Sequence, residues 1–303
     1  MKSHKPTFRH RIEYAAICFG IRLIQLLPPT KCRPLATMLG TIGFATMNRR
    51  RDIACSNVRL AAITNDETEV RRIARASMIH FIYVAIISLQ AVGGKSPQHE
   101  IVEEIDPAAR EVLADPDKGV ILCSGHLGNW EAGLQAVAKQ FPLLGIARRM
   151  NNPLVENLMA FRNHDNIEIT PKHDQDAARL LRALAEGRNV GILFDQHAAG
   201  KRGVMVPFFG VPAATYTSPA MLHLTTKAPI CFSTCVEIAP GQYRLRIDPP
   251  FVYTRTGDRK EDTTQILQAL HSKLENAIRE YPTQYLWAHR RWRNKDQSSE
   301  STP

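Results

Sequence analysis

Cysteine is scarce in this sequence, and the cysteines that are present show no regular spacing. Six occur in 303 residues, and no two of them form a CxxC pair. In a chain of this length, such usage is typical of reduced thiols in a cytosolic environment. We therefore expect buried free cysteines and no disulfide framework.

Long apolar runs are absent as well. No charge-free run reaches the roughly 18 apolar residues that a membrane-spanning helix needs, and the mean hydropathy is −0.23. Apolar residues make up 44% and charged residues 22% of the chain, close to the average for a soluble protein. These values exclude a polytopic membrane protein and a disordered, collagen-like or repeat-built chain. They leave one large α/β domain or two small domains as the expected organisation.

The middle of the chain has no net charge, although the whole chain carries +10. Residues 1–52 contain ten lysines and arginines against Glu13 and Asp52, and the remaining positive excess lies in residues 286–303. A nucleic-acid-binding domain spreads cations over its folded surface and interleaves aromatics, so we expect no nucleic acid partner. Cations that flank the apolar segments 14–27 and 35–47 suit an anionic membrane surface instead.

The first apolar segment, residues 14–27, fits a surface helix better than the alternatives. A signal peptide would need a small-residue cleavage site, and none precedes Pro28. Arg22 interrupts the segment and makes it marginal as a membrane span. A helix that lies in the membrane interface accommodates both Arg11 and Arg22, because their side chains can reach the headgroups. Packing of the helix on its own domain is the remaining alternative.

The pattern of apolar residues divides the chain into three parts. Residues 1–95 are predicted to be an all-helical, basic leader, whose last helix begins at a capping box of Thr64 and Glu67 and ends before Gly93. Residues 96–295 alternate short apolar runs with helical patterns, which predicts an α/β domain with a mixed, mostly parallel sheet flanked by helices. Residues 296–303 are predicted to be a disordered tail.

Individual elements can be placed within the second part. The expected strands are 119–125, 143–148, 167–169 and 189–194, followed by a hairpin across residues 240–241. The expected helices are 129–140, one starting at 152, 175–186, one starting at 218, and 261–280. Residues 196–214 are predicted to form a long loop because they are rich in glycine and proline. We expect strand 143–148 to lie next to strand 119–125.

His126 and Glu131 carry the chemistry that the sequence indicates most directly. They occur in SGHLGNWE, where a buried strand ends and a helix begins, the place where open α/β sheets hold their sites. A histidine there can act as a general base near neutral pH. A carboxylate five residues later can fold back onto the imidazole, fix its tautomer and stabilise the imidazolium. The alternative is a capping histidine with a solvated helix glutamate.

The H-x4-E spacing resembles that of the glycerolipid and lysophospholipid acyltransferase superfamily. The longer string GHLGNWE resembles the branch that holds the lipid A biosynthesis acyltransferases of the lauroyl and myristoyl type. Three more segments are similar to motifs of that branch in order and spacing: Arg148 with Asn152-Pro153, FDQHAAGKRGVMVPFFG at 194–210, and PTQYLWAHRRWR at 282–293. The resemblance covers residues 8–293. Arg149 departs from it, because proline is common there in lipid A enzymes.

The resemblance implies an O-acyltransferase with a glycerolipid-acyltransferase-like fold. Such an enzyme moves a fatty acyl chain from an acyl thioester, of acyl carrier protein or coenzyme A, to a hydroxyl of a membrane lipid, and needs no further cofactor. A lipid A precursor is the acceptor that it indicates first, with another glycolipid or a lysophospholipid as alternatives. It implies a location at the cytoplasmic face of the inner membrane, through a monotopic or single N-terminal helix. The implied partners are the membrane lipid acceptor, acyl carrier protein and an anionic membrane surface.

The resemblance also implies roles for particular residues. His126 is the base and Glu131 orients it. Arg148 stabilises the oxyanion or binds an acceptor phosphate, with an exposed surface arginine as the alternative. Asn129 is assigned to substrate binding. Asp195 lines the catalytic pocket or caps a loop.

Other charged and aromatic residues have weaker assignments. Lys201 and Arg202 steer a phosphorylated sugar or are solvated loop charges. Phe208 and Phe209 line an acyl groove or anchor their loop. The arginines and tryptophans at positions 287, 290, 291 and 292 face a lipid interface or belong to a packed C-terminal segment.

Two other classes of protein are alternatives. A metal-dependent hydrolase would use the ligands supplied by His126, His164, His173, Asp195, His197 and His223, although no metal-binding spacing such as HExxH or HxH occurs among them. We therefore predict no metal site. A non-catalytic membrane-binding protein of the same fold is the second alternative, and the intact pair of His126 and Glu131 argues against it.

Overall fold

The computed structural model describes residues 6–92, 100–147, 150–159, 163, 166–171, 176–200 and 203–293. The three-part division of the chain by composition stays a prediction, since its first boundary near residue 95 and its tail lie outside these residues.

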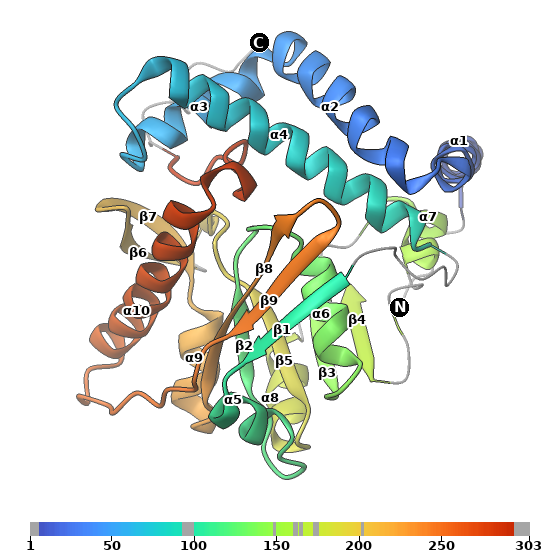
Figure 1. The fold of residues 1–303 in the computed structure, drawn as a ribbon. Coiled ribbons are helices and arrows are strands. Elements are labelled where there is room, and N and C mark those ends of the chain that lie inside the picture. The colour runs from blue at the N-terminus through green and yellow to red at the C-terminus, as the bar shows by residue number, and fades with distance from the viewer. Residues whose placement is uncertain are drawn as a thin grey trace.

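Four helices form the N-terminal part, as predicted (Figure 1). They are α1 (Phe8–Leu26), α2 (Pro29–Thr46), α3 (Asn48–Leu60) and α4 (Glu67–Gln90). The predicted capping box is wrong in detail. The N-cap of α4 is Asp66, whose carboxylate accepts a hydrogen bond from the backbone of Thr68, while the Thr64 hydroxyl accepts from the backbone of Asp66. Aspartate satisfies a free N–H at a helix start and also complements the helix dipole.

A seven-stranded sheet forms the centre of the molecule. Its spatial order is β1-β9-β8-β2-β5-β3-β4, and every neighbouring pair is parallel except β8 with β9. This confirms the mixed, mostly parallel sheet. The strands are β1 (Glu100–Ile105), β2 (Ile121–Ser124), β3 (Leu143–Ala147), β4 (Ile167–Pro171), β5 (Asn189–Leu193), β8 (Ile230–Ala239) and β9 (Gln242–Ile247).

Helices cover both faces of this sheet. Along β2, Ile121 and Cys123 belong to one buried cluster, whereas Leu122 belongs to another, as the alternation of side chains in a strand requires. The first cluster includes residues of α3, α4, α9 and α10, and the second includes residues of α5 and α6. The helices of this part are α5 (Pro107–Leu113), α6 (Trp130–Ala138), α7 (Pro153–Met159), α8 (Asp176–Ala185), α9 (Ser218–Thr226) and α10 (Arg259–Glu280), followed by the short η3 (Pro282–Gln284).

Two predictions about this part are wrong. Strand β3 does not lie next to β2, because β5 is inserted between them. Residues 196–214 are not a continuous loop, because β6 (Gly203–Phe208) and β7 (Val211–Tyr216) form an antiparallel hairpin. Its two-residue turn has φ 52° at Phe209 and 73° at Gly210, which suits the twist of a tight hairpin. Prolines are tolerated there because a two-stranded ribbon consists of edges.

The N-terminal helices pack onto the end of the chain. The Ser77 hydroxyl of α4 donates a hydrogen bond to the carbonyl of Tyr285 at 2.5 Å. The Asn57 amide of α3 donates to the carbonyls of Trp287 and His289, each at 2.7 Å. The positions of α3, α4 and the C-terminal segment are therefore coupled.

Within the described residues, one helix, α4, is long and apolar enough to cross a membrane by length and composition. The side chains of α4 contribute to the core clusters next to the sheet, and 44% of its most apolar 18-residue stretch is buried in the protein. Helix α1 is different, because Ile21 is its only buried residue. Among the described residues, most of the exposed large apolar side chains lie on α1 and α2.

Candidate active site

His126 lies where β2 ends and the chain turns into α6. The carbonyl of His126 accepts a hydrogen bond from the backbone N–H of Leu286. Two residues later, the N–H of Gly128 donates to the carbonyl of Gln284. Gly128 has φ +63°, and a Cβ there would lie 2.0 Å from the carbonyl oxygen of Cys235. Only glycine fits this turn, so the backbone around His126 is fixed from two sides.

The carboxylate of Asp195 holds the imidazole of His126. Asp195 follows β5, the strand directly beside β2, so the carboxyl ends of the two strands bring the residues together. One carboxylate oxygen lies 2.7 Å from Nδ1 of His126, and the other accepts from the backbone N–H of His126 at 2.8 Å. A proton on Nδ1 satisfies this contact and leaves the lone pair of Nε2 free to accept a proton.

Electrostatics keep Asp195 ionised. Burial by itself would raise the pKa of this carboxyl, which is 2% exposed. The charge of His126 and the hydrogen bonds from its ring and backbone outweigh burial, with a further contribution from Arg291, and lower the pKa to about 2. A buried anion is thus placed behind the imidazole, where it stabilises a protonated His126.

Arg291 is a buried part of this arrangement. Its guanidinium donates to the carbonyl of Ala214 and the hydroxyl of Thr215, both in β7, and lies 3.2 Å from Nε2 of His271. Burial lowers the pKa of Arg291, and burial together with the charge of Arg291 lowers the pKa of His271 to about 4. For Arg291 the packed-segment interpretation is therefore confirmed, and the lipid-interface interpretation is wrong.

Residues that the sequence did not single out complete the surroundings of the imidazole. The side-chain nitrogen of Gln196 lies 3.1 Å from Nε2 of His126, where an acceptor hydroxyl would have to bind. The centre of the Trp130 ring lies 5.0 Å from the centre of the imidazole, and the ring of Phe81 in α4 packs against the Trp130 ring. Burial lowers the pKa of His289 to about 4, and Asp195 and His126 are among its electrostatic neighbours. The strings FDQH and WAHRRW contain Gln196 and His289, and were a signal for both.

Glu131 occupies the first turn of α6, where its charge is favourable to the helix dipole. We expected it to be the carboxylate that orients His126, but the carboxylate at Nδ1 is that of Asp195. The pairing depends on the neighbouring positions of β2 and β5, which spacing along the chain does not reveal. Glu131 stays a predicted site residue.

Substrate binding by Asn129 stays a prediction, and the contacts of this residue in the structure are with the protein itself. Its side-chain oxygen caps α6 by accepting from the backbone N–H of Ala132 at 3.1 Å, and its own N–H donates to the carbonyl of Cys235. Asn129 is buried, so it is a structural cap of the turn.

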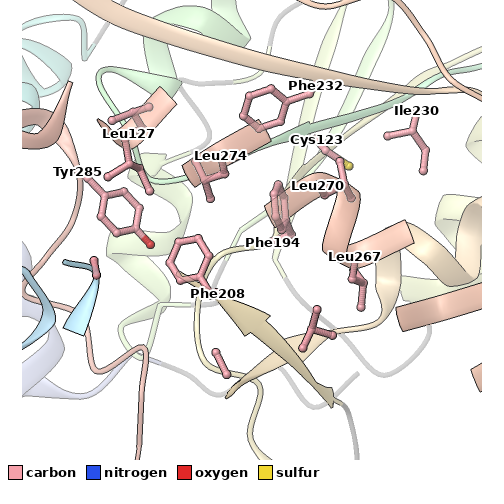
Figure 2. Close-up of a cluster of buried hydrophobic side chains, with 14 of the residues drawn as sticks. Cys123, Leu127, Phe194, Phe208, Ile230, Phe232, Leu267, Leu270, Leu274 and Tyr285 are labelled. Carbon is pink, nitrogen blue, oxygen red and sulfur yellow. The ribbon is translucent and has the colours of Figure 1, made fainter. Parts of the chain in front are cut away.

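Of the two interpretations of Phe208 and Phe209, anchoring of the β6–β7 hairpin is the one that their contacts support. Phe208 is completely buried and packs against His271, Tyr285 and Trp292. Figure 2 shows Phe208 inside the cluster that holds Phe194 and Tyr285. Phe209 lies in the turn, where its N–H donates to the Glu275 carboxylate.

Arg148, Lys201 and Arg202 lie outside the described residues, so their roles remain predictions. Among the described residues, no group of three histidine, cysteine or acidic side chains is close enough to hold a metal ion. His164 and His173 lie outside these residues. His223 has a structural role, because its ring bonds to the carbonyl of Ala228 and accepts from the backbone of Tyr253.

Comparisons with known proteins give a consistent result. The family model described as bacterial lipid A biosynthesis acyltransferase matches residues 1–294. The chain is 25% identical over 280 residues to the lipid A biosynthesis lauroyltransferase of Escherichia coli (strain K12), covering 90% of this chain and 89% of that protein. It is equally identical over 280 residues to the lipid A biosynthesis palmitoleoyltransferase of the same organism, covering 90% and 88%.

A solved structure is similar at a lower sequence identity. The 1-acyl-sn-glycerophosphate acyltransferase of Thermotoga maritima aligns with a TM-score of 0.37 and 11% identity, over 80% of this chain and 96% of that one.

Proposed function

Because the chain belongs to the bacterial lipid A biosynthesis acyltransferase family, and is thus an O-acyltransferase acting on a lipid, we propose that it transfers a fatty acyl chain from a thioester to a hydroxyl of a lipid A precursor. The curated relatives support this acceptor, since their names describe lauroyl and palmitoleoyl transfer in lipid A biosynthesis. This activity would place the protein in lipopolysaccharide and glycolipid biosynthesis.

The observation that carries the proposed mechanism is the contact between His126 and Asp195. Nε2 of His126 takes the proton of the acceptor hydroxyl, and the resulting oxygen attacks the thioester carbonyl carbon. The tetrahedral intermediate collapses with cleavage of the carbon–sulfur bond, and His126 returns the proton to the thiolate that leaves. Asp195 stabilises the imidazolium between these two proton transfers.

No nucleophile from the protein is required, because the acceptor supplies its own hydroxyl. The cysteines closest to the sheet centre are poor nucleophiles. Burial raises the pKa of Cys123 far above its ordinary value and raises the pKa of both Cys231 and Cys235 to about 12. Direct transfer without an acyl-enzyme is therefore the route that these residues favour. We propose no metal and no resident cofactor for it.

The remaining predicted residues have subsidiary roles in this proposal. Glu131, at the start of α6, adds negative charge to the same turn. Arg148 is proposed to stabilise the oxyanion of the intermediate, where one preorganised donor contributes about 3–4 kcal/mol. Lys201 and Arg202 are proposed to attract a phosphorylated acceptor.

The donor is proposed to be acyl carrier protein rather than coenzyme A. The chain is basic at both ends, and acyl carrier protein is acidic, so complementary charge would speed their encounter. Both thioesters have the same reacting bond, and the mechanism above is the same for each.

We propose that the protein works at the cytoplasmic face of the inner membrane. Helices α1 and α2 expose large apolar side chains to solvent: Phe8, Ile12, Phe19, Leu23, Leu26, Met38, Leu39 and Ile42. Basic residues of the leader lie among them, as in helices that bind in the interface of anionic membranes.

The proposed function can be tested with purified full-length protein and a panel of substrates. Lauroyl, myristoyl and palmitoleoyl thioesters of acyl carrier protein and coenzyme A are each combined with a lipid A precursor, a mannosylated phosphoinositide and a lysophospholipid. Mass spectrometry is expected to show an added acyl chain on the lipid A precursor. Acylation of only another acceptor would replace the proposed substrate, and acylation of none would reject the proposed function.

A further inference from the structure

Four arginines gather where the start of α3 meets the C-terminal segment. Arg49 and Arg50 belong to the first turn of α3, and Arg290 and Arg293 lie on either side of the buried Arg291 in the C-terminal segment. We call these four residues the arginine cluster. The charge of Arg49 is the largest cause that lowers the pKa of Arg290, and Arg293 and Arg50 act in the same direction. Within the described part of the chain, no carboxylate forms an ion pair with any of the four.

Hydrogen bonds hold this cluster beside the candidate active site. The Arg50 guanidinium donates to the carbonyl of Ala288 at 3.0 Å, and the Asn57 amide donates to the carbonyls on either side of it. The same segment begins with Leu286, whose N–H bonds to the carbonyl of His126 at 3.1 Å. Figure 1 shows the C-terminal segment, in red, between α10 and the underside of α3 and α4. Arg290 and Arg293 therefore lie on the segment whose beginning bonds to the backbone of His126, and Arg49 and Arg50 lie on the helix that is bonded to that segment.

This arrangement is unfavourable for the fold alone. The first turn of α3 contains three consecutive arginines and no acidic residue, and its N-cap Met47 makes no side-chain cap. Positive charges at the start of a helix oppose its dipole, and like charges placed together repel. A bound anion would interact favourably with both the helix dipole and the clustered positive charges.

A neighbouring groove indicates what kind of anion fits. Arg51, the next residue of α3, lines a groove of about 630 Å³ between α2 and α4. Its walls include Phe44 and Ile79, and its rim carries Arg71 and Arg75. The Arg71 guanidinium lies 5.8 Å from the centre of the Phe44 ring. An apolar floor with a cationic rim suits an anionic amphiphile more than the convex surface of a carrier protein.

We propose that the arginine cluster binds a phosphate on the headgroup of the lipid acceptor, while the groove accommodates an adjoining part of the same lipid. Planar guanidinium groups bind phosphate through paired hydrogen bonds. Met38 and Ile42 of α2, and Met47 at its C-cap, are exposed apolar residues that would face the membrane that supplies the lipid. This inference rests on the proposed function, because it names a binding subsite for the acceptor of that reaction.

The test compares the double variant Arg49→Gln/Arg290→Gln with wild type, and uses Arg110→Gln as the control. Arg110 is an exposed arginine of α5, at the far end of the molecule from α3 in Figure 1. Steady-state kinetics are measured on a phosphorylated lipid A precursor and on the same lipid after enzymatic dephosphorylation. The double variant is expected to raise KM for the phosphorylated acceptor by at least about tenfold, with kcat and the KM for the dephosphorylated acceptor nearly unchanged.

Two results would overturn the inference. One is an equal loss on both acceptors, and the other is a change confined to the KM for acyl carrier protein, which would assign the cluster to the donor. Thermal unfolding separates a structural role from a binding role. The double variant is expected to keep or raise the Tm of wild type, because like charges are removed, whereas a lower Tm with an equal loss on both acceptors would make the cluster structural.

A binding measurement that needs no catalysis distinguishes failure of this inference from failure of the proposed function. The His126→Ala protein is treated with phenylglyoxal, with and without micelles of the phosphorylated lipid, and modified arginines are identified by mass spectrometry. Protection of Arg49 and Arg290, but not of Arg110, is expected. Protection in the His126→Ala protein, together with no acyl transfer by the wild-type protein, would retain the subsite and reject the function. Acyl transfer without protection would reject the subsite and retain the function.

Discussion

At the scale of single residues, the site depends on one buried carboxylate that bonds to two atoms of one histidine. Asp195 contacts both Nδ1 and the backbone N–H of His126. The first contact selects the tautomer, and the second fixes the distance between β2 and β5. Asp195 is thus expected to contribute both to catalysis and to stability, and the two contributions can be measured separately.

Asp195→Asn is expected to lower kcat by about 10²–10⁴-fold. An amide can accept from the His126 backbone, but its NH₂ group would face Nδ1 and favour the tautomer with the proton on Nε2. That tautomer cannot take a proton from the acceptor. The measurement is the acyl-transfer rate with saturating donor and acceptor. A variant with more than a few per cent of wild-type kcat would contradict the assigned role.

The stability that Asp195 contributes is expected to depend on pH in a definite direction. Its folded pKa, about 2, is lower than its ordinary value of 3.8. The contribution is therefore present above about pH 4 and is lost as the pH falls toward 2. A shift of this size corresponds to about 2 kcal/mol. Urea unfolding of wild type and Asp195→Asn is expected to show a stability difference that shrinks between pH 5 and pH 3. A difference that grows over this interval would contradict the pairing.

At the scale of elements, the β2–α6 turn positions His126 by close contact with β8. Gly128 has a positive φ and no space for a Cβ, whereas Gly200 has φ +66° and open space, with nothing within 4 Å of the place that an alanine methyl group would take. The two glycines share a backbone conformation and differ in packing. They form a matched pair for testing how the turn is held.

Gly200→Ala is expected to destabilise the protein by about 1 kcal/mol, the cost of the left-handed conformation for alanine. Gly128→Ala is expected to cost several times more and to abolish acyl transfer, because the Cβ would displace β8 or move His126. Thermal unfolding and activity assays of both variants provide the test. Equal losses of stability would show that backbone conformation, rather than the contact with Cys235, constrains the turn.

The elements themselves were largely predictable, but their neighbours in the sheet were not. Strands β2, β3 and β5 are short buried apolar runs and appear where the sequence placed them. Their spatial order depends on which helix crosses which face, so the insertion of β5 beside β2 was missed. For the same reason the sequence indicated Glu131, and not Asp195, as the carboxylate beside the imidazole of His126. The β6–β7 hairpin was missed because its prolines and glycines are also typical of loops.

At the scale of the whole molecule, a catalytic α/β unit is joined to an apolar, basic surface. Helix α1 has only one buried residue, Ile21, and polar bonds such as that from the Asn152 amide to the carbonyl of His10 join it to the remainder. Helices α3 and α4, in contrast, share the main core. The leader is therefore predicted to combine a membrane contact in α1 and α2 with a structural support in α3 and α4.

Deletion of residues 1–28 is expected to release the protein from anionic vesicles and leave the remainder folded. Binding of the full chain to these vesicles is expected to weaken with salt, because exposed charges are screened beyond about 10 Å at 0.1 M. Vesicle sedimentation at low and high salt, with circular dichroism of the truncated protein, provides the measurement. Sedimentation of the truncated protein at the level of the full chain would show that α1 is not the attachment.

The most direct test of the proposed mechanism is the rate of acyl transfer by His126→Ala under single-turnover conditions. The acceptor is the phosphorylated lipid A precursor and the donor is acyl carrier protein bearing a lauroyl chain. Loss of the general base is expected to lower the rate about 10²–10⁴-fold, with the Tm and vesicle binding of wild type retained. A folded, membrane-bound His126→Ala protein that transfers the acyl chain at more than a few per cent of the wild-type rate would contradict the proposed mechanism.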